Sequence, residues 1–183
     1  MRMPRSQGEF VAALSAAWMP GDWFRLTPEV ASHYSHKAAI CQEVSPKTAI
    51  EIGTRCGYSL VAFSMAANDA RFLCFDGAVD DDSGPCLDHW HRIVDRHGID
   101  ASLVVVDTAH VKRLPLADFA HVDGDHSYSG ALRDLRLVSG CKTILADDCC
   151  NPDVRRAVEQ FVSESGRTAR YFFDGLRESA VLT

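Results

Sequence analysis

The sequence predicts an α/β fold in which helices cover both faces of a mostly parallel sheet. From Thr48 onward, short apolar runs alternate with amphipathic stretches, which is typical of repeated strand–helix–strand units. The last two apolar runs are separated only by a short turn at Asp174-Gly175, so the strands they predict must be antiparallel. With 183 residues and no repeat or linker, the chain is expected to form a single domain.

Residues 1–46 are expected to form a helical cap, or lid, on a core that spans residues 47–183. Apolar residues four positions apart predict a first helix over Ser6–Ala17. Thr27, followed directly by a proline, predicts the N-cap of a second helix that runs to about Val44.

The loop between these two helices carries Trp18, Trp23 and Phe24 around the turn signal Pro20-Gly21. Aromatic side chains gathered in a loop have two explanations. They pack onto the edge of the domain, or they form a hydrophobic lid over a substrate. The residues alone favour neither explanation.

The core is expected to contain seven strands. Short apolar runs predict five parallel strands: Thr48–Ile52, Arg71–Phe75, Ser102–Val106, Phe119–Val122 and Thr143–Ala146. Amphipathic stretches predict the helices among them: Ser59–Ala67, Leu87–Arg96, Ala131–Val138 and Val154–Ser163. Two further runs, Ala169–Phe173 and Ser179–Leu182, predict the closing hairpin.

Charge and hydropathy narrow the kind of partner. The formal net charge is −6 and no basic run occurs, which argues against a nucleic-acid binder. No apolar stretch approaches the ~20 residues that a membrane span needs, so no membrane partner is expected. An acidic balance suits a cationic ligand or a site that holds a divalent metal ion.

Cysteine usage indicates the compartment. Seven cysteines without a C-x-x-C pair predict a reduced, cytoplasmic protein rather than a disulfide-bonded secreted one. The apolar run Phe10–Met19 follows Arg2 and Arg5, as the core of a signal peptide would. Glu9 abuts that run, however, and its apolar residues recur at helical spacing, so an amphipathic helix is expected instead.

Ligands of open α/β sheets bind beyond the carboxyl ends of the strands. The first strand ends in a turn from Glu51 to Ser59, in which Gly53 permits a sharp bend and Gly57 allows the next helix to come close. The turn is typical of a nucleotide or nucleoside site, although a tight turn without a ligand is the alternative. It lacks the full G-x-G-x-x-G of dinucleotide sites and the Gly-Lys-Ser/Thr end of a P-loop.

The next two strand ends suggest a nucleoside. Asp76 ends the second strand about twenty residues on, where an acidic side chain can accept hydrogen bonds from both ribose hydroxyls. Asp107 and Thr108 follow the third strand, where a short polar pair can reach an adenine edge.

Acidic residues crowd the ends of the fourth and fifth strands. One run contains Asp123, Asp125 and His126, and the other contains Asp147 and Asp148. Bare carboxylates this close would repel one another, and Mg²⁺ would relieve the repulsion because it binds oxygen ligands. The alternative is that some of these residues cap helices: Asp125 or Ser129 after the fourth strand, and Asp148 or Asn151 after the fifth.

Taken together, these motifs resemble the class I S-adenosylmethionine (SAM)-dependent methyltransferases. Within that class they are similar to the small metal-dependent O-methyltransferases of antibiotic sugars, over about residues 45–183. The resemblance implies a Rossmann-like seven-stranded sheet, mostly parallel with an antiparallel C-terminal strand. It also implies the SAM contacts, which are Glu51, Gly53, Thr54, Gly57, Tyr58, Ser59, Asp76, Asp107, Thr108 and Asp123.

The same resemblance implies the reaction. Asp123, Asp147 and Asp148 would hold a Mg²⁺ that polarises a hydroxyl of a small-molecule acceptor. Relatives place the general base at the position of either Asp125 or His126. The ordinary pKa of histidine, ~6.5 against ~3.9 for aspartate, slightly favours His126.

Two alternatives stay open. A metal-independent methyltransferase would work without any ion at these carboxylates. A SAM-binding subunit without activity of its own would lend its fold to a larger partner. A homo-oligomer is compatible with either.

Overall fold

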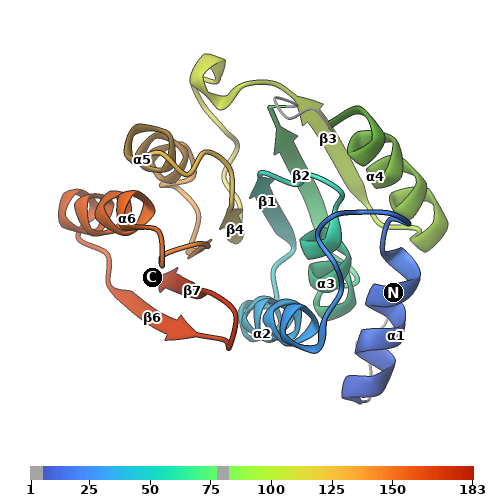
Figure 1. Ribbon diagram of the computed structural model, residues 1–183. Helices are drawn as coiled ribbons and strands as arrows, with labels where there is room; N and C mark the ends of the chain where they lie inside the picture. Colours follow the sequence, from blue (N-terminus) through green and yellow to red (C-terminus); the bar gives the residue numbers. More distant parts are fainter. Residues whose placement is uncertain (1–5, 78–82) are drawn as a thin grey trace.

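The computed structural model describes residues 6–77 and 83–183, and its centre is a seven-stranded sheet (Figure 1). Arg2 and Arg5, on which the signal-peptide alternative depended, lie outside the described residues. The strands are β1 (Thr48–Ile52), β2 (Arg71–Asp76), β3 (Ala101–Val105), β4 (Phe119–Val122), β5 (Thr143–Ala146), β6 (Ala169–Phe173) and β7 (Glu178–Leu182).

Six α-helices and one short 3₁₀ helix connect these strands. They are α1 (Gln7–Ala17), α2 (Pro28–Val44), α3 (Tyr58–Ala66), α4 (Ser83–His97), η1 (Thr108–His110), α5 (Tyr128–Leu137) and α6 (Pro152–Ser165). Within the described part of the chain, no helix is both long and apolar enough to cross a membrane.

The strand order is β3-β2-β1-β4-β5-β7-β6. Neighbouring strands from β3 to β5 pair in parallel, whereas β7 runs antiparallel to both β5 and β6. The predicted seven-stranded sheet with an antiparallel last strand is therefore confirmed. The chain leaves the β3 edge and returns beside β1 as β4, so the strand order reverses between β1 and β4, the point where such sheets bind ligands.

The two faces of the sheet carry separate apolar cores. Helices α1 to α4 contribute the core of one face, where Leu14, Phe63 and Trp90 are fully buried. Helices α5 and α6 pack on each other over the second face, around Leu135 and Phe161. The sheet is thus the middle layer of three (Figure 1).

Helix ends follow the predicted caps with one exception. Thr27 caps α2, and Asn151 caps α6 through the backbone N–H of Asp153. Ser6, predicted as the first residue of the first helix, is the N-cap of α1. The cap of α5 is Ser127, whose hydroxyl accepts from Gly130, so the prediction of Asp125 or Ser129 was wrong. β3 begins and ends one residue before the predicted range Ser102–Val106, and the short helix η1 was not predicted.

The turn after β1 depends on a close backbone approach. Gly53 has a φ of 84°. Its backbone N–H donates a hydrogen bond of 2.8 Å to the carbonyl oxygen of Phe75 in β2. A Cβ at this position would collide with the backbone carbonyl of Asp123. Only glycine therefore allows the end of β1 to lie directly beside the end of β4.

Gly53→Ala should destabilise the fold by about 3 kcal/mol or more, because it adds a backbone clash to left-handed strain. Gly98→Ala is the matched control, since Gly98 also has a positive φ but has open space where a Cβ would lie. It should lose only the strain, about 1–2 kcal/mol. Urea denaturation measures both losses, and equal losses would contradict the role of the close approach.

Candidate active site

A cavity of about 530 Å³ opens at the carboxyl end of the sheet, beside the point where the strand order reverses. Its wall contains most of the residues predicted to bind SAM or to act as base: Gly53, Thr54, Tyr58, Ser59, Asp76, Asp107, Thr108, Asp123, Asp125 and His126. Glu51, Gly57, Asp147 and Asp148 lie behind this wall. The topology has therefore gathered residues from five segments of the chain.

Glu51 supports the cavity wall from inside the protein. Its carboxylate accepts hydrogen bonds from the hydroxyls of Thr54 (2.8 Å) and Ser59, and it lies 3.1 Å from Nδ1 of His121. Burial alone would raise the pKa of Glu51, but these partners hold it below its ordinary value. Glu51 therefore fixes the shape of the β1 turn, and the prediction that it contacts the cofactor stays untested.

Asp76, the last residue of β2, lines the cavity, and its predicted contact with a ribose stays untested. One of its carboxylate oxygens accepts from the backbone N–H of Arg55 at 2.8 Å, where the chain adopts a positive φ of 43°. The turn after β1 therefore holds the carboxylate in place at the end of β2.

The wall around Thr108 contains charged residues that the motifs did not indicate. The hydroxyl of Thr108 donates to the buried carboxylate of Asp134 at 2.7 Å and accepts from Arg133 at 3.0 Å. Burial raises the pKa of Asp134. Asp107 caps η1 through the backbone N–H of Ala109. This end of the cavity is thus a hydrogen-bonded network rather than a lone polar pair.

The N-terminal loop closes over the β1 turn. Buried Asp22 accepts two hydrogen bonds of 3.0 Å from the Arg55 guanidinium and one of 2.6 Å from the hydroxyl of Tyr58. Burial alone would raise the pKa of Asp22, but these donors lower it. The ring of Trp18 stacks on Tyr58 with centroids 3.7 Å apart.

The aromatic residues of this loop divide between the two expected roles. Trp18 packs against the domain, and its indole N–H donates to the carbonyl of Phe24. Trp23 is 73% exposed and lies over the guanidinium of Arg55, and both Trp23 and Phe24 line the cavity. One residue anchors the loop and two form part of the rim.

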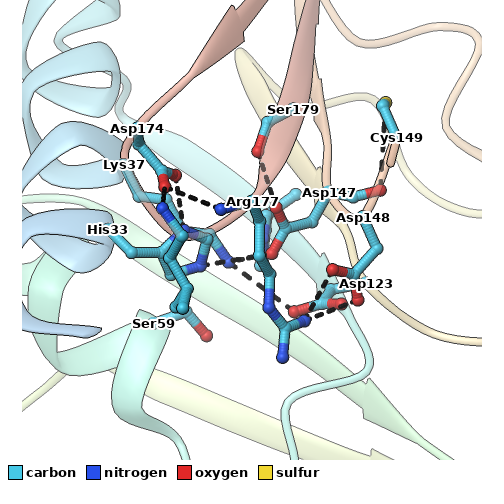
Figure 2. A network of polar contacts seen from close by, with 12 residues as sticks. His33, Lys37, Ser59, Asp123, Asp147, Asp148, Cys149, Asp174, Arg177 and Ser179 are labelled. Carbon is cyan, nitrogen blue, oxygen red and sulfur yellow. Dashed lines mark hydrogen bonds and ion pairs between the residues drawn. The ribbon is translucent and has the colours of Figure 1, made fainter. Parts of the chain in front are cut away.

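Asp147 is buried, and its carboxylate lies among several polar side chains (Figure 2). Nζ of Lys37 lies 2.5 Å from Oδ2 of Asp147. The two atoms form an ion pair, but their geometry is not that of a hydrogen bond. The hydroxyl of Ser179 donates to Oδ1 at 2.6 Å, and Nε2 of His33 lies 3.4 Å from Oδ2. Although burial opposes both charges, Lys37 holds the pKa of Asp147 well below its ordinary range, and Asp147 raises that of Lys37.

Asp148 and Asp123 are also paired with basic groups. Nη1 of Arg177 lies 2.6 Å from each carboxylate oxygen of Asp148 (Figure 2). Nε2 of His126 lies between Asp148 at 3.1 Å and Asp123 at 3.4 Å. Nζ of Lys37 approaches Asp123 to 3.6 Å. Every carboxylate of this cluster therefore faces a nitrogen of the chain.

Asp125 faces a different part of the cavity. Oδ1 accepts from the backbone N–H of Ser127 at 2.8 Å, and Oδ2 lies 3.7 Å from Arg133. Asp125 therefore lies toward the network around Thr108, whereas His126 lies toward the acidic cluster.

The predicted magnesium ligands lie close together, but basic side chains of the chain already contact them. Two groups, His121/Asp123/Asp147 and Asp123/His126/Asp148, each offer three ligand atoms within 4.8 Å of one another. Lys37 and Arg177, however, already contact the carboxylates of both groups. A divalent cation would have to displace at least one of these positive charges, at a cost in electrostatic repulsion.

Several charged or polar residues of the site escaped the motif search, among them His33, Lys37, Asp134 and Arg177. His33 and Lys37 lie one helical turn apart on the buried face of α2, among Val30 and Tyr34. Charged or polar residues on an otherwise apolar helix face are a usable signal, because lysine is almost never fully buried unless it is paired. Arg177 follows the hairpin turn and carries no comparable signal.

Asp22→Asn should destabilise the protein by about 1–3 kcal/mol and weaken S-adenosylhomocysteine (SAH) binding, because Arg55 and Tyr58 lose a charged acceptor. The control is Asp95→Asn at an exposed position of α4. Urea denaturation and calorimetric titration give the two readouts. The closure of the loop would be in doubt if both variants behaved like the wild type.

The imidazole of His126 should titrate far above the ordinary value of ~6.5. Hydrogen bonds to Asp123 and Asp148 raise its pKa to about 10. Asp148→Asn removes one of these anions and should shift the midpoint downward, because the protonated ring loses a stabilising charge. NMR titration of the ring protons measures both midpoints, and a wild-type midpoint near neutrality would contradict the described contacts.

Comparisons with known proteins bear on this arrangement. A family model described as a methyltransferase domain matches residues 50–150, which span β1 to the end of β5 and hence the strand ends that build the cavity. No curated protein matches the chain.

Solved structures share the fold over nearly the whole chain. SAH-bound methyltransferase PaMTH1 from Podospora anserina has a TM-score of 0.66 at 13% identity, over 99% of this chain and 88% of that one. An O-methyltransferase from Bacillus cereus in complex with SAH has a TM-score of 0.62 at 15% identity, over 98% and 92%.

A third neighbour is the O-methyltransferase TomG from Streptomyces achromogenes, involved in tomaymycin synthesis and solved with SAM. Its TM-score is 0.62 at 13% identity, over 99% of this chain and 89% of that one. The match of the family model and the shared fold confirm the family that the motifs resembled. This chain belongs to the methyltransferase-domain family.

Proposed function

We propose that this protein is a SAM-dependent O-methyltransferase that moves a methyl group to a hydroxyl of a small molecule. The observation that carries the proposal is one cavity lined by two sets of residues, which we call its nucleoside end and its acceptor end. Asp76 lies beside the β1 turn at one end, and His126 faces the acidic cluster at the other. A nucleoside and an acceptor therefore have separate places along one wall.

The first end suits SAM by its shape and its hydrogen-bonding groups. Gly53 lines the cavity, and its lack of a side chain lets the ends of β1 and β4 lie together and shape this part of the wall. Asp76 offers a fixed carboxylate to ribose hydroxyls, and the side chains of Ile52 and Phe75 add apolar lining. The B. cereus protein and TomG, which share the fold, were solved with SAH and SAM.

Methyl transfer needs an electrophile and a base. When bound, SAM supplies a methyl carbon whose bond to the sulfonium sulfur breaks, with its electron pair, as the bond to the acceptor oxygen forms. The chain positions the acceptor and removes the hydroxyl proton. Holding both reactants in one geometry supplies a large share of the rate enhancement of such reactions.

His126 is the proposed base because it is the residue that lies among the acids of the acceptor end. Its ring nitrogen lies between Asp123 and Asp148, which stabilise the imidazolium that proton transfer creates. Burial raises the pKa of Asp125, but hydrogen bonds from Ser127 lower it below its ordinary value. The carboxylate of Asp125 lies beside the guanidinium of Arg133. That geometry supports a role at the nucleoside end for Asp125.

Magnesium assistance is the less favoured form of the reaction. It would require Asp123, Asp147 and Asp148 to turn toward an ion, and these side chains are paired with Lys37 and Arg177. The metal-independent alternative requires no rearrangement of this cluster.

His126→Gln should lower kcat by about 10²- to 10⁴-fold while SAH binds normally, because only proton removal is lost. Asp125→Asn, its neighbour in the same turn, should retain most of kcat. Transfer from methyl-labelled SAM to a panel of phenolic, catecholic and sugar hydroxyl compounds supplies the acceptor and the rate. The wild-type rate should also rise with pH above 7, since His126 must release its proton before it can act.

Two outcomes would contradict the proposal. Equal losses in the two variants would remove His126 from the role of base. Tight SAH binding without transfer to any compound of the panel would favour the non-catalytic SAM-binding subunit.

A further inference from the structure

We propose that Lys37 and Arg177 replace a divalent metal ion at the acceptor end of the cavity. The inference rests on the proposed function and names the positive charge that the methyl-transfer site uses. It assigns Arg177 to the acceptor oxygen as a catalytic residue. It assigns Lys37 to the carboxylates behind the wall as a positioning residue.

The two nitrogens contact the three carboxylates that the resemblance assigns to an ion. Nζ of Lys37 lies between Oδ2 of Asp147 at 2.5 Å and Oδ2 of Asp123 at 3.6 Å. Nη1 of Arg177 lies 2.6 Å from both oxygens of Asp148 (Figure 2). These two cations contact all three carboxylates, and His126 also faces Asp123 and Asp148.

Lys37 cannot make way for an ion without disrupting the interior. It is 1% exposed and belongs to α2, whose residues Tyr34, Ala38 and Cys41 are buried against the domain. Moving its ammonium group would leave Asp147 buried without its strongest counter-charge, which is costly. The pair is therefore a permanent part of the fold.

A second connection ties Arg177 to the same helix. Oδ1 of Asp174 accepts from the backbone N–H groups of Leu176 and Arg177 at 2.9 and 3.0 Å. Oδ2 of Asp174 lies 2.6 Å from Nδ1 of His33, one turn before Lys37 on α2. The hairpin turn is held so that the guanidinium of Arg177 lies over Asp148.

Arg177 can also reach the reacting atoms. Its side chain is 31% exposed, and it lines the cavity together with His126. As the acceptor proton moves to His126, negative charge develops on the oxygen. That charge is consumed as the oxygen–methyl bond forms, while the carbon–sulfur bond breaks and its electron pair neutralises the sulfonium. A fixed cation beside that oxygen stabilises the transition state, as a bound metal would.

The test measures metal binding and methyl transfer on the same protein. Mn²⁺, as a paramagnetic substitute for Mg²⁺, is titrated into the wild type with and without SAH and followed by electron paramagnetic resonance. We expect no bound Mn²⁺ up to about 1 mM, the weak end of protein sites for divalent cations. Methyl transfer to the acceptor found in the panel should be unchanged by EDTA.

Arg177→Met should lower kcat by about 100-fold or more, the loss expected when one charge-stabilising donor is removed, with SAH binding unchanged. It should also create Mn²⁺ binding, because Asp148 loses its counter-charge. Arg170→Met, at an exposed position of the same hairpin, is the matched control and should alter neither. Lys37→Met should likewise gain Mn²⁺ binding. If Lys37→Met does not fold, Arg177→Met alone tests whether loss of a counter-charge creates Mn²⁺ binding.

The outcomes separate this inference from the proposed function. Mn²⁺ binding by the wild type, or loss of methyl transfer when EDTA is added, contradicts the proposal that Lys37 and Arg177 replace a metal ion. Either result leaves the proposed methyl transfer itself standing. Failure to bind SAH overturns the proposed function, and the Mn²⁺ titration still decides whether the carboxylates take an ion. An unchanged kcat in Arg177→Met removes that residue from the acceptor.

Discussion

The buried ion pair between Lys37 and Asp147 is the contact on which the site depends. The parallel topology ends β4 and β5 side by side, and the sequence places aspartates directly after both. Carboxylates gathered in this way would repel one another and oppose folding. A lysine from α2 offsets that repulsion inside the protein, so the same contact joins the helical cap to the sheet and lets the acids stay together.

The cap is consequently part of the active site rather than an attachment to it. Asp22 holds the loop against Arg55 and Tyr58, whereas His33 and Lys37 hold α2 against the acidic cluster. One contact set lies beside the β1 turn, where we propose that the nucleoside binds, and the other lies at the acidic cluster, where we propose that the acceptor binds. Movement of the cap relative to the sheet would therefore disturb both ends of the cavity at once.

The sequence predicted the sheet well because each strand is a short apolar run of its own, bounded by local turn signals. Gly53, Asp76 and His126 could be found for a related reason, since each follows a recognisable strand end. The errors are of a different kind. Whether Asp125, Ser127 or Ser129 caps α5 depends on backbone angles that the three neighbouring polar residues do not distinguish.

Counter-charges could not be predicted because they come from distant segments. Acidic residues in a local run predict repulsion, and repulsion can be relieved by a bound metal or by basic side chains from elsewhere in the chain. Here Lys37 precedes the sheet and Arg177 lies in the last hairpin, so no spacing links either to Asp147 or Asp148. An acidic motif therefore predicts that positive charge must lie nearby. Whether that charge comes from the protein or from an ion depends on the fold.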